Sequence, residues 1–148
     1  MKTKPTNKGH DFTKKKKVSI WASQYPYQDI PEAYFEETFS RKNTRAVNVW
    51  SENFKLCYFN PENMETNGTM EGLIDIKQAV GACSFSTSYI VNLMSKAKQK
   101  KLENVSWVVL LFENEYSVKT TSVAKDEYLT FLGAFTYDNS ADNLFEAE

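Results

Sequence analysis

The chain has 148 residues, about one domain's worth, and with 41% hydrophobic and 14% aromatic residues it is not a disordered or fibrous protein. Its longest apolar run is Trp107 to Phe112, far shorter than the roughly 20 residues of a membrane-spanning helix. The net charge of −1 conceals an asymmetry, because residues 1–17 carry seven lysines and one aspartate, which leaves the rest of the chain acidic.

The first predicted unit is a disordered basic tail over residues 1–16, followed by a structured domain over 17–138. Val18, Ile20 and Ala22 alternate with polar residues and Trp21, which predicts a first strand with Trp21 on the opposite face.

The motif Asp29-Ile30-Pro31-Glu32 combines a capping residue, a first-turn proline and an acidic residue. It predicts a helix that ends near Ser40. Residues 47–50 fit either a strand or a short helix, 54–59 favour a strand, and Asn67-Gly68 indicates a turn.

Two helices are predicted next, a short one over Leu73–Cys83 and a clearer one over Tyr89–Ala97. For the second, Ser84, Ser86 or Thr87 is the expected cap. Residues 105–112 are apolar on both faces, which predicts a central strand covered on both sides.

After a polar excursion over 113–126, the last predicted strand has one shared face. The residues placed on that face are Leu129, Phe131, Gly133, Phe135 and Tyr137. Residues 139–148 are expected to be a frayed acidic end. The elements together predict a single α+β domain with a mainly antiparallel sheet and helices packed on one face.

The composition also limits the chemistry. The only histidine, His10, lies in the predicted tail, so the domain can form neither a Ser/His/Asp triad nor a two-histidine metal site. We therefore expect no catalysis and no cofactor.

Cys57 and Cys83 lie in apolar segments without CxxC spacing and are predicted to be buried free thiols, with a single disulfide as the alternative. No apolar stretch follows the first lysines before Val18, so no secretory signal is expected and the predicted location is cytoplasmic.

Several segments from Lys17 to Tyr137 together resemble the immunity protein 22 family of bacterial polymorphic toxin systems. The segments that carry the resemblance are Val18-Ser19-Ile20-Trp21, Tyr34-Phe35-Glu36-Glu37, Tyr58-Phe59-Asn60-Pro61-Glu62-Asn63-Met64-Glu65, Cys83-Ser84-Phe85-Ser86, Val108 to Phe112 and Leu129 to Phe135. The resemblance implies a protein that neutralises a cognate toxin, with nucleases as one candidate class, by stoichiometric occlusion. A monomer or weak dimer is expected.

Acidic and aromatic residues are the candidate toxin contacts, because charge steers a basic partner and rings anchor it. Glu62 and Glu65 beside Tyr58 form one candidate patch, with a solvated loop as the alternative, and Trp50 is the preferred exposed anchor. A second group is expected to meet at one end of the sheet. Its members are Glu113, Glu115, Asp126 and Glu127, for which a divalent-ion site, an acid/base pair and ordinary surface charge are the alternatives.

Two rival functions remain open from the sequence. Lys14 to Lys17 suit phosphate contacts, so the alternative function is a nucleic-acid-associated accessory protein, although a solubilising arm explains the same residues. The other rival is a small enzyme that uses only carboxylates and tyrosines. We favour a toxin partner over both.

Overall fold

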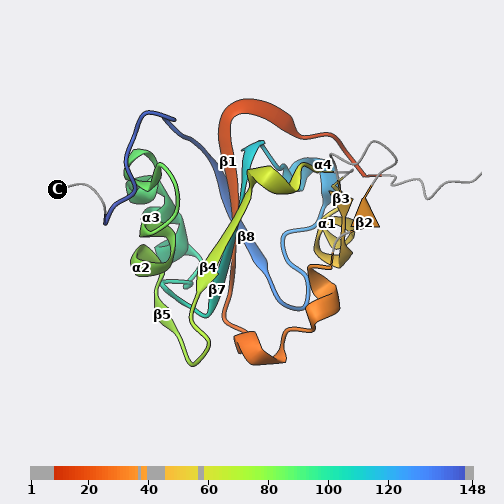
Figure 1. The fold of residues 1–148 in the computed structure, drawn as a ribbon, viewed down its shortest axis with the longest axis horizontal. Coiled ribbons are helices and arrows are strands. Elements are labelled where there is room, and N and C mark those ends of the chain that lie inside the picture. Colours follow the sequence, from red (N-terminus) through yellow and green to blue (C-terminus); the bar gives the residue numbers. More distant parts are fainter. Residues whose placement is uncertain (1–8, 37, 40–45, 57–58, 146–148) are drawn as a thin grey trace, which may run out of the picture.

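The computed structural model describes residues 9–36, 38–39, 46–56 and 59–145. Its centre is a four-stranded antiparallel sheet in the order β4-β7-β1-β8 (Figure 1). These strands are β4 (Met64–Gly68), β7 (Trp107–Asn114), β1 (Thr13–Ser23) and β8 (Thr130–Thr136). Two small antiparallel pairs join β2 (Thr38–Phe39) to β3 (Ala46–Val47) and β5 (Ile74–Asp75) to β6 (Asn104–Val105).

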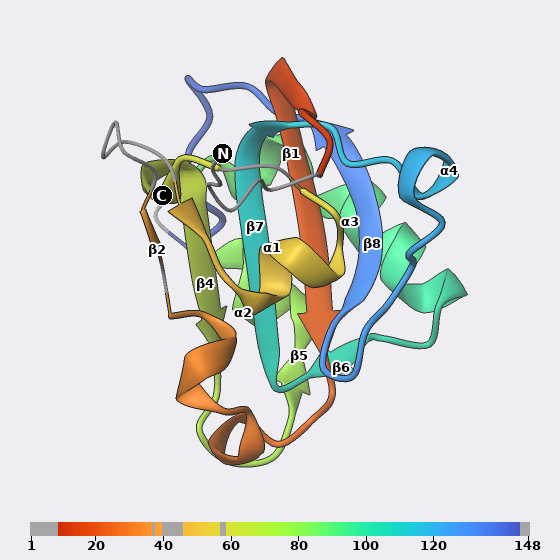
Figure 2. The same ribbon diagram turned by 90° about the vertical axis from the view of Figure 1, so that its right-hand side faces the viewer.

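The helices are short. They are α1 (Val49–Asn53), α2 (Ile76–Gly81), α3 (Ile90–Gln99) and α4 (Val118–Thr121), with 3₁₀ turns η1 (Tyr27–Asp29), η2 (Glu32–Tyr34), η3 (Pro61–Asn63) and η4 (Ser86–Ser88). The two longer helices, α2 and α3, lie on one face of the sheet, and α1 lies on the other (Figures 1 and 2). The α+β class is therefore confirmed, but the second face also has a cover that contains a helix.

The layer under α2 and α3 is mostly aliphatic, and we call it the helix-side core. It contains alternate residues of β1 and the inward faces of both helices. Its fully buried members include Val18, Ile20, Ile76, Val80, Leu93, Val108 and Leu110. The predicted helix over Tyr89–Ala97 is confirmed as α3, but Tyr89 is its N-cap and no serine or threonine side chain caps it.

The opposite layer is mostly aromatic, and we call it the aromatic core. Its buried members are Trp21, Tyr34, Trp50, Phe54, Leu56, Phe59, Val109, Leu111, Tyr116, Leu129 and Phe131. Trp21 belongs to this layer while Ile20 and Ala22 belong to the other, as the alternation along β1 predicts. β7 contributes to both layers, which confirms its prediction as a central strand covered on both sides.

β8 does not keep one face throughout. The pairing with β1 shifts between Ile20, which lies opposite Gly133, and Trp21, which lies opposite Phe131. This β-bulge changes which side chains point to which layer, so Phe131 lies in the aromatic core and Phe135 in the helix-side core. The predicted single face is therefore wrong at the bulge, where Gly133 has a φ of 157°.

The predicted helix from Asp29 to Ser40 is also wrong. The segment forms two 3₁₀ turns, η1 and η2, and then β2. Pro31 precedes η2 in an extended conformation, and the Asp29 side chain caps no helix. Since a proline disfavours helical geometry in the residue before it, Ile30 is extended and the two turns cannot merge.

Three neighbouring predictions need correction. Phe54 ends α1 and Leu56 forms only an isolated bridge to His10, so the described part of 54–59 holds no strand. Asn67-Gly68 closes β4 instead of forming a turn. The predicted helix over Leu73–Cys83 is shortened to α2, because Ile74 pairs with Val105 in β5–β6.

Both ends of the domain are more ordered than the sequence predicts. β1 begins at Thr13, and the half-buried Phe12 packs against the aromatic core, so strand pairing holds part of the predicted tail. Near the other end, the Leu144 amide donates to the Gly81 carbonyl at 2.9 Å, which ties this segment to α2. Residues 1–8 and 146–148 lie outside the described residues. Among those described, no helix has the length and apolarity that crossing a bilayer requires.

Candidate protein-binding face

The segment from Tyr25 to Glu36 lines one side of the molecule with rings and carboxylates. Tyr27 lies 4.2 Å from the Trp107 ring, centroid to centroid, and Tyr25 meets Tyr128 edge to face at 4.8 Å. Both tyrosines are half-buried, so part of each residue remains open to solvent. We call this segment the aromatic shelf.

The shelf depends on a glycine in the edge strand. Trp107 begins β7 and lies opposite Gly68 of β4. A Cβ atom on Gly68 would lie 2.4 Å from Cε3 of the Trp107 ring and 2.1 Å from the Ser106 carbonyl oxygen. Because Gly68 has no side chain, the indole can lie against β4 and support Tyr27.

Asp126 fastens the shelf to the rest of the domain. Its carboxylate accepts hydrogen bonds from the Tyr34 hydroxyl, from Asn53 Nδ2 at 3.0 Å and from the Leu129 amide at 2.8 Å. Burial first, and then the contact with Asp126, raise the pKa of Tyr34 well above its ordinary value, so its hydroxyl stays protonated and donates. Asp126 therefore joins the shelf, α1 and the start of β8.

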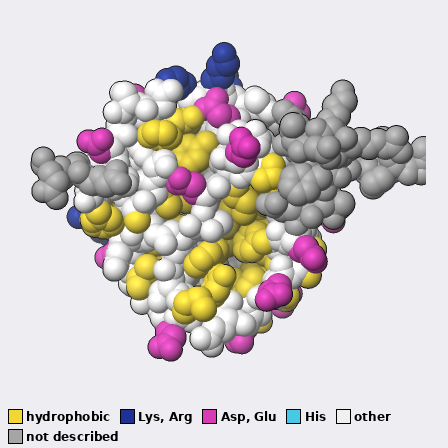
Figure 3. Space-filling model, viewed as in Figure 1, with side chains coloured by type: hydrophobic (Ala, Val, Ile, Leu, Met, Phe, Trp, Pro, Cys, Tyr) yellow, Lys and Arg dark blue, Asp and Glu magenta, His cyan; other side chains and the backbone are white. Residues whose placement is uncertain are grey.

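The surface around β4 and the shelf is acidic. In Figure 3, which shows the side where β4 faces the viewer, carboxylates are spread among apolar patches and lysine appears only at the rim. From Gln24 to Asp75 the only described basic residue is Lys55. The described carboxylates over this range are Asp29, Glu32, Glu36, Glu52, Glu62, Glu65, Glu71 and Asp75.

A comparison with known protein families assigns the chain. A family model described as Immunity protein 22 matches residues 18–138, which include the entire sheet apart from the start of β1. The chain belongs to the immunity protein 22 family. No curated protein and no solved structure matches it.

For this member of the immunity protein 22 family, two aromatic contacts predicted from the sequence have different outcomes. Trp50 is fully buried, because α1 directs it into the aromatic core between Trp21 and Phe59. It is a core residue and not an exposed anchor, so that prediction is wrong. Tyr58 lies outside the described residues.

The predicted pair Glu62 and Glu65 is divided between surface and interior. Glu62 lies exposed in η3. Glu65 points to the face of β4 that lies toward α2 and α3. There its carboxylate accepts hydrogen bonds from the Ser84 amide at 2.8 Å and the Ser84 hydroxyl at 2.5 Å. Glu65 thus connects β4 to the chain between α2 and α3, and of the two only Glu62 is fully available to a partner.

The four carboxylates expected at one sheet end lie at two ends. β7 and β8 both run antiparallel to β1, so Glu113 and Glu115 at the end of β7 lie far along the sheet from Asp126 and Glu127, which precede β8. Glu127 is exposed. The described residues contain no group of three or more side chains suited to a metal ion.

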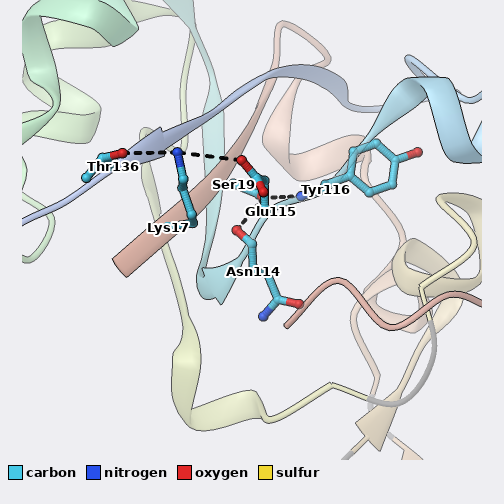
Figure 4. Close-up of polar contacts among 6 residues, drawn as sticks. All are labelled: Lys17, Ser19, Asn114, Glu115, Tyr116 and Thr136. Carbon is cyan, nitrogen blue, oxygen red and sulfur yellow. Dashed lines mark hydrogen bonds and ion pairs between the residues drawn. The ribbon is translucent and has the colours of Figure 1, made fainter. Parts of the chain in front are cut away.

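Glu113 and Glu115 are occupied by contacts to the lysine-rich strand. Glu113 accepts hydrogen bonds from the Lys16 amide and the Tyr137 hydroxyl. Glu115 forms an ion pair with Lys17 at 3.5 Å, and the same ammonium donates to the Thr136 hydroxyl (Figure 4). Part of the lysine run therefore serves the fold and is not a free phosphate-binding arm.

The cysteine prediction holds for Cys83, which is a buried free thiol. Burial, followed by the nearby Glu65 carboxylate, raises its pKa to about 12. Cys57 lies outside the described residues.

The aromatic shelf itself was missed by sequence reasoning. The signal available was a run from Gln24 to Ser40 with acids and aromatics but no lysine or arginine.

Proposed function

We propose that this immunity protein binds the toxin domain encoded beside it and blocks its active site or substrate groove, with no reaction of its own. The observation that carries the proposal is the family match over residues 18–138, since immunity proteins act on toxin partners. The acidic face supports the same function, because nucleic-acid-degrading toxins bind a polyanion and are commonly basic.

We further propose that the toxin meets the face formed by the aromatic shelf and η3. Glu32, Glu36 and Glu62 are exposed there, and Tyr27 offers a half-open ring supported by Trp107. Exposed charges speed the encounter of opposite partners, while partly desolvated rings slow their separation. Asp126, Glu65 and Trp50 serve this surface indirectly, by holding the domain together.

The test is charge reversal with a matched control. Glu32→Lys with Glu62→Lys changes the net charge as much as Glu103→Lys with Asp142→Lys, and all four residues are exposed. We expect the first pair to slow association with the toxin about tenfold at low salt and the control pair to have a much smaller effect. Toxin survival assays in bacteria give the functional readout.

Equal binding by both double variants would contradict the assignment of the face. A wild-type chain that neither binds nor protects against the toxin encoded next to it would contradict the function itself.

A further inference from the structure

β4 is an edge strand with backbone groups directed away from the sheet. The Thr69 amide donates to the Ser106 carbonyl at 2.9 Å, just beyond the β4–β7 ladder. Hydrogen-bonded and non-bonded pairs alternate along an antiparallel ladder. Since Thr69 bonds toward β7, every second residue before it, namely Asn67 and Glu65, also bonds to β7. The residues between them, Thr66 and Gly68, direct their amides and carbonyls outward.

These outward groups have no partner among the described residues. The neighbouring Met64 amide is already used, since it donates to the Pro61 carbonyl in η3. The other sheet edge differs, because the Phe131 amide of β8 donates to the Ala124 carbonyl and the Phe131 carbonyl accepts from Lys100 Nζ. β4 is thus the less protected edge.

Both flanks of β4 can receive side chains from an added strand. On the helix side, Asn67 and Gly68 line an open groove of about 680 Å³ together with Ile74, Gln78, Ala82 and Phe145 of the opposite wall. On the other side lie Trp107 and the aromatic shelf. In an extended peptide, alternate side chains point to opposite faces, which matches a surface recessed on one side and aromatic on the other.

The charge around β4 selects the occupant. Glu62 precedes the strand, Glu71 follows it and Asp75 lines the groove, where Lys77 is the one basic residue among the described lining residues. An added strand with lysine or arginine side chains would find opposite charges at both ends of β4. A second copy of this acidic face would bring like charges together.

We propose that an extended, basic segment of the toxin pairs with β4 and becomes a fifth strand of the sheet. This inference rests on the proposed function and names how the partner is held. Main-chain hydrogen bonds to Thr66 and Gly68 supply the alignment, and the acidic residues at both ends supply the selectivity for a basic segment.

The first test removes one outward amide. Thr66→Pro deletes an N–H that β7 does not use, and proline is tolerated on an edge strand in that orientation. The control Thr66→Ala keeps the N–H and removes only an exposed side chain. With an inactivated toxin domain from the adjacent gene, Thr66→Pro should weaken binding about tenfold or more, since a bond is lost and the ring obstructs the added strand. Thr66→Ala should stay within about twofold of wild type.

Amide hydrogen exchange on the unmodified protein gives a second test that needs no substitution. In the free chain, Thr66 and Gly68 should exchange fast while Glu65 and Asn67 are protected, and toxin should protect all four. Unchanged exchange at Thr66 and Gly68 in a saturated complex would overturn the inference, as would toxin binding by Thr66→Pro at wild-type strength. Protection of Thr66 on concentrating the chain alone would assign the edge to a second copy and overturn it too. In each case the proposed function survives if wild type still binds toxin.

Discussion

The two faces of the sheet are covered in different ways. The helix-side core lies under α2 and α3 and is mostly aliphatic. The aromatic core lies under α1, β2–β3, α4 and 3₁₀ turns, and its rings form an edge-to-face cluster around Trp21. Large rings bury much area per residue, and here short irregular segments cover them, whereas the aliphatic layer is covered by the apolar stripes of two helices.

The largest expected effect is on stability in the aromatic core. Trp21 meets the rings of Trp50, Tyr116 and Phe131 at centroid distances of 5.1, 5.3 and 5.2 Å. Trp21→Ala should lower the free energy of unfolding by about 4 kcal/mol, and Leu93→Ala, its counterpart in the helix-side core, by about 3 kcal/mol. Urea denaturation measures both. A smaller loss for Trp21→Ala than for Leu93→Ala would break the comparison, because the rings would then add little to the fold.

A smaller loss is expected where a carboxylate fastens the cover of the aromatic core. Asp126→Ala leaves the Tyr34 hydroxyl and the Leu129 amide without their acceptor and should cost about 2 kcal/mol. The adjacent exposed Glu127→Ala should change stability by no more than about 0.5 kcal/mol. Equal effects of the two substitutions in thermal melts would show that Asp126 does not fasten the cover.

The next effect depends on pH and lies at the edge of the helix-side core. Burial and the hydrogen bond to Glu113 raise the pKa of Tyr137 to about 12 from an ordinary 10.0. The folded state therefore holds the phenol proton more tightly than the unfolded state. The contribution of the Tyr137 phenol to the free energy of unfolding is complete below pH 10 and is lost as the pH rises from 10 to 12. Urea titrations at several alkaline pH values should show that the free energy of unfolding falls less steeply with pH for Tyr137→Phe than for wild type. Equal slopes for the two proteins would contradict the assignment.

The smallest effect is expected on the outside of α3. Val91 is 75% exposed although its neighbour Ile90 is buried in the helix-side core. Val91→Ser should change the free energy of unfolding by less than about 0.5 kcal/mol. A loss of 1 kcal/mol or more in chemical denaturation would show that this valine is covered in solution.

The difference between the two layers also decides which elements can be predicted from the sequence. The helix α3 and the strands β1 and β7 were predicted because one face or both faces of each meet a continuous core, which imposes a clear hydrophobic period. The cover of the aromatic core has no such period. Its Tyr34 and Phe35 look helical by spacing, but Pro31 and the long-range packing of these rings on Tyr128 and Trp50 decide the conformation instead.

The candidate site was predictable in chemistry and not in position. Acidic and aromatic residues were the expected contacts, and Glu62 does lie exposed beside β4. Trp50 and Glu65 were misplaced, because whether a tryptophan or a glutamate points in or out depends on partners distant in the sequence, here Trp21 and Ser84. The strand β4 was missed since it is short and polar, as exposed edge strands commonly are.

The place of β1 in the sheet governs the order in which the molecule can form. Among the described strands, β1 is synthesised before its partners β7 and β8, so Val18 can pair with Phe112 and Phe135 only after those residues have been made. Contacts that span most of a chain form slowly, and here the final strand must emerge before the sheet can close. The four-stranded sheet is therefore complete only in copies of the chain in which β8 has already been synthesised.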